Sequence, residues 1–403
     1  MNDDCVGSPT GPPGLEQLIA QDARLLSGQL AALRHRLFPP SAQKSLRGFS
    51  SGEAAELIGV SDAYLRQLAL AGEAPEAARG TAGRRVYTLG QINMLRRSLS
   101  GGRGRVYSPT RREADHLQVM AVTNFKGGSG KTTTAAHLAQ YLALHGYRVL
   151  AIDLDPQASL SALFGYQPET DVAENATLFG ALRYDARVRP LAEVIRPTYF
   201  PGLDLVPGNL ELQEFEHDTP RMLAGRLPGG QDLFFARIAA ALLTVEAEYD
   251  VVVIDCPPQL GFLTLAALCA ASGVLVTIHP QMLDIASMSQ FLLMTADLLE
   301  VVQRAGGRLR LDFLRYLVTR YEPQDGPQAQ VVAFLRTLFG ERVLTNAMLK
   351  STAISDAGLT KQTLYEIGRQ GLTRATYGRA MEALNGVNHE IEALIRGAWG
   401  RNA

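Results

Sequence analysis

A glycine- and lysine-rich string at residues 124–134, N-F-K-G-G-S-G-K-T-T-T, places the strongest constraint on the fold of this chain. It follows an apolar β-branched run and opens a segment rich in Ala, His, Leu and Gln. A phosphate-binding loop between a strand and a helix needs glycines that let backbone N–H groups converge, a lysine for the β- and γ-phosphates, and a hydroxyl for Mg²⁺. The helix N-terminus adds its dipole to this cradle. The string therefore predicts a P-loop, and its candidate nucleotide-binding residues are Lys126, Gly127, Gly128, Ser129, Gly130, Lys131, Thr132 and Thr133.

The loop departs from the standard spacing at one place. The pattern G-x-x-x-x-G-K-[ST] would put glycine at position 125, where this chain has Phe125. A second lysine, Lys126, instead stands directly before the first glycine pair. The position of this second lysine distinguishes the loop from one with the standard spacing.

The remainder of the chain after Leu117 alternates short apolar runs with longer amphipathic segments. Strands that read as continuous apolar runs, joined by helices, indicate a parallel sheet that is buried on both faces. We therefore expect an α/β fold, with a mostly parallel twisted sheet and helices on both faces. The expected strands lie at 119–124, 148–153, 250–255, 273–278 and 313–319.

Aspartates follow two of these runs. Asp153 and Asp155 stand in D-L-D-P-Q, and Asp255 ends V-V-V-I-D. A strand-terminal aspartate beside the P-loop strand is where P-loop proteins hold the magnesium shell. A single such residue is more often a helix cap or a turn residue, but three in order behind a P-loop favour a nucleotide site. The candidate metal-binding residues are Thr132, Asp155 and Asp255, and Asp153 is a further candidate for the nucleotide site.

A basic segment precedes the P-loop region. Between Gln43 and Arg112 there are 12 Lys and Arg against 5 Asp and Glu, although the whole chain has a net charge of −1. F-S-S-G-E-A-A-E-L-I-G-V-S-D-A-Y-L-R-Q-L-A-L (49–70) has the pattern of a helix-turn-helix, with a possible capping box formed by Ser50 and Glu53. A-R-G-T-A-G-R-R-V-Y (78–87) is typical of a hairpin wing. We expect a winged helix-turn-helix, although many helical hairpins pack proteins together instead. Its candidate DNA-binding residues are Ser61, Tyr64, Arg66, Arg79, Arg84 and Arg85.

The other sequence signals concern organisation and compartment. Leucine and isoleucine at helical spacing over residues 15–37 predict a helix with one apolar face. Three cysteines without a C-x-x-C pair indicate a reducing, cytosolic compartment and no zinc or iron–sulfur site. No signal peptide is visible, and the longest apolar stretch, Leu265–Ile278, is too short to span a bilayer. The predicted domains are 1–42 (N-terminal helix), 43–100 (winged helix-turn-helix), 101–116 (linker) and 117–403 (ATPase).

Three motifs in this order, K-G-G-S-G-K-T-T, D-L-D-P-Q and V-I-D-C-P-P, resemble the deviant-Walker ATPases of the ParA/MinD type. Further segments look like the RepA partition proteins of repABC-type plasmids, and the resemblance covers nearly the whole chain. These segments are L-D-I-A-S-M-S-Q-F-L (283–292), V-T-R-Y-E-P-Q-D-G-P-Q (318–328) and N-A-M-L-K-S-T-A-I-S-D-A (346–357).

The resemblance implies a set of functional expectations. ATP or ADP with Mg²⁺ would be bound, and two chains would close on ATP as a sandwich homodimer. Lys126 would reach the partner's phosphates, as an arginine finger does in GTPases. Lys131 and Asp155 complete the expected catalytic set, because Asp155 matches the position that orients the attacking water. Thr319 and Arg320 fall near the expected adenine pocket.

The family also implies two kinds of DNA binding. The ATP-bound dimer would bind nucleoid DNA without sequence preference, and a ParB/RepB-type protein would stimulate hydrolysis. The helix-turn-helix would repress the chain's own operator. The protein would be cytoplasmic and associated with the nucleoid, with no membrane attachment. The candidate residues for non-specific DNA binding are Arg320, Lys350 and Lys361.

Two other functions compete with plasmid partition. One is a transcriptional repressor that senses nucleotide with little turnover, and Asp155 argues against it because a sensor needs no water-orienting group. The other is a metabolic enzyme of the same superfamily, such as an ATP-dependent carboxylate ligase. The helix-turn-helix pattern argues against this second possibility.

Overall fold

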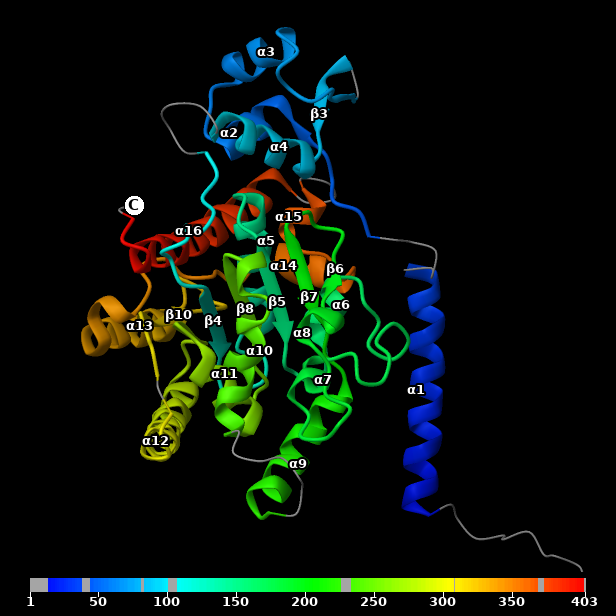
Figure 1. Cartoon of the computed structure of the whole chain (residues 1–403), viewed down its shortest axis with the longest axis vertical. Coiled ribbons are helices and arrows are strands. Elements are labelled where there is room, and N and C mark those ends of the chain that lie inside the picture. Colours follow the sequence, from blue (N-terminus) through cyan, green and yellow to red (C-terminus); the bar gives the residue numbers. More distant parts are fainter. Residues whose placement is uncertain are drawn as a thin grey trace, which may run out of the picture. The chain divides into compact units, whose positions relative to one another are not determined.

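A computed structural model describes residues 14–37, 44–80, 83–100, 107–225, 233–307, 309–368 and 373–401 (Figure 1). The chain divides into two compact units, Met1–Lys44 and Ser45–Ala403. The first unit contains α1 (Leu15–Leu37), which has the predicted bounds. The apolar side chains Leu15, Leu18, Ile19, Leu25 and Leu26 of this helix are exposed.

The second unit is built on a seven-stranded sheet that is parallel except at one edge. Its order is β10-β9-β4-β8-β5-β7-β6, and only the β6–β7 pair is antiparallel. The mostly parallel sheet confirms the expected α/β fold of the sheet domain, while the two edge strands β6 and β7 were not predicted. The strands are β4 (Gln118–Thr123), β5 (Val149–Asp153), β6 (Arg196–Pro197), β7 (Leu203–Val206), β8 (Val251–Asp255), β9 (Gly273–Ile278) and β10 (Phe313–Val318).

Helices cover both faces of this sheet, and two hydrophobic cores result. Because successive side chains of a strand point to opposite faces, Met120 and Val122 of β4 enter one core while Val119 and Ala121 enter the other. The helices are α5 (Lys131–Leu144), α6 (Ser159–Leu163), α7 (Leu178–Leu182), α8 (Leu191–Val194), α9 (Gln213–Leu223), α10 (Arg237–Leu243), α11 (Phe262–Ala270), α12 (Met282–Arg304), α13 (Gly326–Phe339), α14 (Thr352–Leu359), α15 (Leu364–Ile367) and α16 (Arg374–Ala398).

The basic segment forms a small three-helix body with a three-stranded antiparallel sheet of order β1-β3-β2. Ser50 and Glu53 form the capping box, and Gly59 ends the first helix at φ 82°. Leu65 and Ile92 are buried in the same core as the helix that follows the P-loop. The elements are β1 (Phe49–Ser50), α2 (Ser51–Ile58), α3 (Asp62–Leu70), β2 (Ala78–Arg79), β3 (Arg85–Tyr87) and α4 (Leu89–Ser100).

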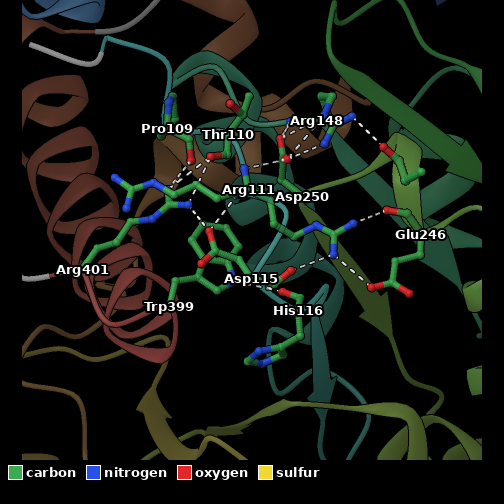
Figure 2. A network of polar contacts seen from close by, with 12 residues as sticks. Pro109, Thr110, Arg111, Asp115, His116, Arg148, Glu246, Asp250, Trp399 and Arg401 are labelled. Carbon is green, nitrogen blue, oxygen red and sulfur yellow. Dashed lines mark hydrogen bonds and ion pairs between the residues drawn. The ribbon is translucent and has the colours of Figure 1, made fainter.

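The segment that leads from the basic body into β4 is fixed to the sheet domain by a polar network (Figure 2). The backbone N–H of Arg111 donates to the Asp250 carboxylate at 2.9 Å, and its guanidinium donates to Glu246 at 2.9 Å. From the C-terminal end of the chain, Arg401 donates to the carbonyls of Pro109 and Thr110. The end of the linker is therefore held by groups that lie 135 or more residues away in sequence.

One helix in the described part of the chain, α12, is long and apolar enough to cross a membrane by length and composition alone. Met288, Phe291 and Val302 of α12 are buried, whereas Leu283, Leu293, Met294 and Val301 are exposed.

Candidate nucleotide-binding site

The P-loop connects the end of β4 to the start of α5, next to the ends of β8 and β9. Gly128 and Gly130 have φ values of 75° and 85°, in the left-handed region where a Cβ would be strained. Gly130 is the N-cap of α5, and among the described residues no side chain caps this helix. The first N–H groups of α5 and the positive end of its dipole are therefore available to an anion.

Lys131 is the lysine that the loop itself holds in place. Its side chain is 6% exposed, and its Nζ donates to the backbone carbonyl of Lys126 at 3.0 Å. Burial lowers the pKa of Lys131, while the carboxylates of Asp255 and Asp155 offset part of that fall. A buried ammonium group in a glycine-rich loop, facing the aspartates, is suited to phosphate oxygens that carry charge.

Lys126 has a different environment. Its ammonium group forms an ion pair with Asp284 in the first turn of α12, and its side chain is 47% exposed. The Asp284 side chain is 8% exposed and also accepts from His279 at 3.2 Å. Lys126 is not among the residues that line the cavity described below. In a single chain, the second lysine is therefore held away from the chain's own phosphate site.

The three predicted aspartates meet at the ends of two neighbouring strands. Asp153 of β5 and Asp255 of β8 are directly paired in register, and both are fully buried. The Asp153 carboxylate accepts from the N–H and hydroxyl of Ser161 at 2.8 and 2.7 Å, and burial raises its pKa to about 7. Asp155 is partly exposed and accepts from the N–H of Gln157 at 2.9 Å.

Asp255 is the unusual member of this group. Neither of its carboxylate oxygens has a hydrogen-bond partner among the described residues. Burial and then the charge of Asp153 raise its pKa well above the usual value, and the nearby Thr132 and Lys131 offset part of that rise. A buried carboxylate without partners is costly, so it indicates a group that binds there in the working state.

These residues fit a magnesium ion. Mg²⁺ is usually bound through one or two carboxylates together with substrate phosphates and water, rather than by a cage of protein ligands. Within the described ranges, no group of three or more His, Cys, Asp or Glu side chains could hold a metal by itself. The Thr132 hydroxyl, the unpartnered Asp255 and the partly exposed Asp155 would therefore hold the ion together with the phosphates.

A cavity of about 630 Å³ opens beside the P-loop. Thr319 lies at its wall, where its hydroxyl donates to the Ser129 carbonyl at 2.8 Å, and Arg320 donates to the Gly128 carbonyl at 3.1 Å. The cavity is lined by Gly127, Gly128, Gly130, Lys131, Thr132, Thr133, Asp155, Gln157, Ser159, Pro258, Thr319, Arg320, Met348, Leu349, Lys350, Ser351, Ile354 and Gly358.

The sequence did not predict the contribution of residues 348–358 to this cavity. The segment reaches it because the N–H of Tyr321 donates to the Met348 carbonyl and the N–H of Lys350 donates to the Tyr321 carbonyl, both at 3.0 Å. Lys350, a candidate for DNA binding, lines the cavity and forms an ion pair with Glu322 at 2.8 Å. A long-range backbone pairing of this kind leaves no local signal in the sequence.

Arg320 is also a candidate for DNA binding and lines the cavity, and the remaining candidate DNA-binding residues lie outside it. Ser61 caps α3 by accepting from the N–H of Tyr64 at 3.1 Å. Tyr64 and Arg66 are exposed on α3, and Arg66 forms an ion pair with Asp62. Lys361 donates to the Gln167 side chain at 2.9 Å. Arg79 of β2 and Arg84, which lies between the two strands, are exposed, and Arg85 of β3 is half-buried.

Comparisons with known proteins agree on one family. Residues 117–305 match the family model described as "AAA domain". The chain is 57% identical to a Rhizobium rhizogenes protein named "Putative replication protein A", over 96% of each chain. It is 33% identical to SopA of Escherichia coli, over 89% of this chain and 92% of SopA.

Solved structures show the same fold. A structure titled "Partition Protein" has a TM-score of 0.65 and 20% identity, and covers 94% of this chain and 99% of its own. A cobyrinic acid a,c-diamide synthase of Mycobacterium smegmatis, solved with a bound ATP analogue and magnesium, is 30% identical with a TM-score of 0.50. It covers 60% of this chain and 94% of its own.

Proposed function

This chain belongs to the ParA-like partition ATPases, and from that premise we propose that it hydrolyses ATP to ADP and phosphate in order to segregate plasmid DNA. The single observation that carries this proposal is the site itself. A P-loop with a free helix N-terminus and a buried lysine lines one cavity, and the unpartnered buried carboxylate of Asp255 ends β8, the strand beside the P-loop strand. The rest of the proposal assigns roles to the residues around it.

The loop would hold the phosphates of ATP. Backbone N–H groups of residues 127–133 and the Lys131 ammonium would bind the phosphate oxygens, because a helix N-terminus and a buried cation favour negative charge. Magnesium, held by Thr132, Asp255 and Asp155 with the phosphates, would supply charge neutralisation. Asp155, with one oxygen engaged by Gln157 and its side chain at the cavity, would orient the attacking water.

Lys126 would act across a dimer. In the single chain its ammonium group is bound by Asp284 rather than by the chain's own cavity. ATP-dependent closure of two chains would exchange this ion pair for contacts with the partner's phosphates, where a cation stabilises charge that develops during phosphoryl transfer. The exposed apolar side chains of α1 would add a second contact between two copies.

DNA would be bound in two ways. The body formed by α2, α3, α4 and the β1-β3-β2 sheet would act as a winged helix-turn-helix, with exposed Tyr64 and Arg66 toward bases and the arginines of the wing toward phosphates. It would repress the chain's own operon. The ATP-bound dimer would bind DNA without sequence preference through basic residues that include Lys361, Arg320 and Lys350. A ParB/RepB-type protein would stimulate hydrolysis, and the protein would reside in the cytoplasm on the nucleoid.

The test is ATP turnover by the wild type, Lys126→Ala and Asp155→Ala, each with Mg²⁺, duplex DNA and the ParB-type protein of the same plasmid. We expect both variants to lose turnover by about 10³-fold or to the detection limit, because each removes transition-state stabilisation. Size-exclusion chromatography with ATP should show that Asp155→Ala still dimerises and Lys126→Ala does not.

Each other outcome has a definite meaning. Wild-type protein that binds ATP and DNA but never turns over, even with its partner, would be a nucleotide-sensing repressor. Wild-type protein that turns over without binding DNA would favour a metabolic enzyme, the class to which the cobyrinic acid a,c-diamide synthase belongs by name. Lys126→Ala that dimerises and hydrolyses like the wild type would show that the second lysine is only a loop residue.

A further inference from the structure

Arg96 lies at the contact between the basic body and the sheet domain, and it is the largest fully buried side chain in the described chain. It is on α4 and is 1% exposed. One of its terminal nitrogens, Nη2, donates to the carbonyl of Leu57 at 2.5 Å and to the carbonyl of Leu144 at 2.6 Å. The other, Nη1, donates to the Asn93 side chain at 2.6 Å.

The two carbonyls belong to the ends of two functionally different helices. Leu57 is in the last turn of α2, in the basic body, and Leu144 is the last residue of α5, the helix that begins at Lys131 of the P-loop. The last carbonyls of a helix have no partner within the helix and carry the negative end of its dipole. A single guanidinium group therefore joins the C-terminal end of the P-loop helix to the helix-turn-helix segment.

The backbone beside Arg96 is shaped to admit it. Gly146, two residues beyond α5, has a φ of 95°, and a Cβ at that position would lie 3.0 Å from both Cδ and Nη1 of Arg96. Burial lowers the pKa of Arg96 to about 10, and the Glu392 carboxylate of α16 opposes that fall. The side chain is therefore charged at neutral pH, and among the described residues its hydrogen bonds go to Asn93 of its own helix and to the ends of α2 and α5.

Stability alone is a weak reason for such an arrangement. Replacing a buried charge with a well-packed apolar side chain is often neutral or stabilising. A buried polar bridge does, however, specify the geometry of the groups that it joins, because each is costly to leave unpaired. This property is useful where the position of one helix must follow that of another.

We propose that Arg96 couples the nucleotide site to the helix-turn-helix body, by making the position of α2 and α3 depend on the position of α5. This inference rests on the proposed function, since it assumes nucleotide at the N-terminus of α5 and DNA at α3. Over its 14 residues α5 is continuous, so a displacement at Lys131 reaches Leu144 as a rigid shift. By linkage, DNA bound at α3 alters nucleotide affinity by the same factor by which nucleotide alters DNA affinity.

The test compares Arg96→Met with Arg97→Met. Methionine keeps most of the apolar stem but cannot donate to either carbonyl, and Arg97 is the adjacent, exposed residue of the same helix. A second variant, Arg96→Gln, keeps a hydrogen-bonding amide that is too short to reach both carbonyls, so the test does not depend on methionine being tolerated. Folding is checked by circular dichroism and thermal unfolding, and nucleotide binding by titration.

The first readout is hydrogen exchange of residues 51–70 with and without a non-hydrolysable ATP analogue and magnesium. We expect nucleotide to change exchange in this segment by at least about twofold in the wild type and in Arg97→Met. Neither Arg96 variant should show this change, although both should bind the analogue with affinity near that of the wild type. A purely structural role would alter stability and leave the nucleotide response in place.

The second readout is the ratio of affinities, with ATP analogue and with ADP, for a labelled duplex taken from directly upstream of the protein's own coding sequence. We expect a ratio that differs from one by about fivefold or more in the wild type and in Arg97→Met. The ratio should fall to about one in the Arg96 variants. A folded Arg96→Met or Arg96→Gln that keeps the wild-type response in both readouts would overturn the proposal.

The failure of the proposed function would look different. Wild-type protein that binds no nucleotide, or no DNA, would contradict the function itself. Wild-type protein that binds both ligands but shows no nucleotide response in residues 51–70 would contradict only the role of Arg96.

Discussion

Two predicted residues of the site, Lys126 and Asp255, do not make in the single chain the contacts that a bound nucleotide and metal would require of them. Lys126 faces Asp284 instead of its own cavity, and Asp255 has no hydrogen-bond partner among the described residues. The sequence predicted both as site residues, because the doubled lysine and the strand-terminal aspartate are local patterns. It could not predict the Asp284 ion pair, since 158 residues separate the two groups.

The role of Asp255 can be tested by Asp255→Asn. The change keeps the shape of the side chain but removes the charge that a magnesium ion needs. Without ligands, thermal unfolding should occur at or above the wild-type temperature, because a buried unpaired carboxylate and its repulsion from Asp153 are removed. The extra stabilisation that Mg²⁺ adds to ATP binding should disappear; in the wild type, a ligand at a hundredfold excess over its Kd contributes about 2.7 kcal/mol.

A matched control for this experiment is Asp204→Asn on β7, whose carboxylate accepts from the Tyr249 hydroxyl at 2.9 Å. This variant should keep the full magnesium-dependent rise in unfolding temperature. If Asp255→Asn also keeps it, Asp255 does not contribute to magnesium binding.

At the scale of elements, apolar patterns in the sequence predicted the central strands, but they did not predict the edge strands or the neighbours of α5. The five apolar runs of the sheet domain became β4, β5, β8, β9 and β10, because central parallel strands are buried on both faces and read as continuous apolar runs. Strand β7 has only four residues and includes Asp204, and β6 is a two-residue edge strand with Pro197, so neither carries that signal. The helix α5 is buried on all sides from Thr134 to Leu144. Its sequence therefore has no exposed polar face from which the elements packed against it could be predicted.

One of those neighbours is α15, whose first residue, Leu364, contacts His137 of α5. The Nδ1 of His137 lies 2.7 Å from the Thr133 carbonyl and must donate to it, so Nε2 is left to accept from the N–H of Leu364 at 3.4 Å. The buried ring is therefore neutral. Protonation would place an N–H of the ring against the N–H of Leu364.

This geometry predicts acid destabilisation. Burial lowers the pKa of His137 below its usual value, so the unfolded chain takes up the proton first. The free energy of unfolding should fall as the pH drops below about 6.5, by up to about 1.4 kcal/mol per pH unit for each proton. The burial of His145 contributes in the same direction. In His137→Gln, the slope between about pH 7 and about pH 5.5 should be shallower by up to one proton.

Denaturant unfolding at a series of pH values measures this slope directly. His217→Gln, an exposed histidine on α9, is the control and should leave the slope unchanged. A His137→Gln slope that matches the wild type would mean that His137 is already protonated, or free to be protonated, in the folded protein.

At the scale of the whole molecule, polar contacts join the basic body that contains α2, α3 and α4 to the sheet domain. The sequence predicts a linker rich in Gly, Arg and Ser between residues 43–100 and 117–403, and all of these segments fall within the compact unit Ser45–Ala403. Arg96 bonds the basic body to the end of α5, and the network around Arg111 and Arg401 holds the end of the linker (Figure 2). Each joins groups that lie far apart in the chain, so composition alone could not reveal them.

The central claim is that two chains share each ATP site, with Lys126 from one chain and Asp155 from the other. Mixed dimers of Lys126→Ala and Asp155→Ala, isolated through a different affinity tag on each chain, test it most directly. One of their two sites would combine an intact Asp155 with a lysine from the partner, and the other would lack both. The measurement is ATP turnover with DNA and the ParB-type partner, and the control pairs Asp155→Ala with a chain that carries both substitutions, which keeps one Lys126 per dimer but leaves no intact Asp155.

If Lys126 acts across the dimer, the mixed dimers should recover about half of the wild-type turnover, because one of two symmetry-related sites is complete. The control dimers should stay inactive. If isolated mixed dimers are as inactive as either variant alone, each site needs both groups from the same chain. The shared-site account of this protein would then be wrong.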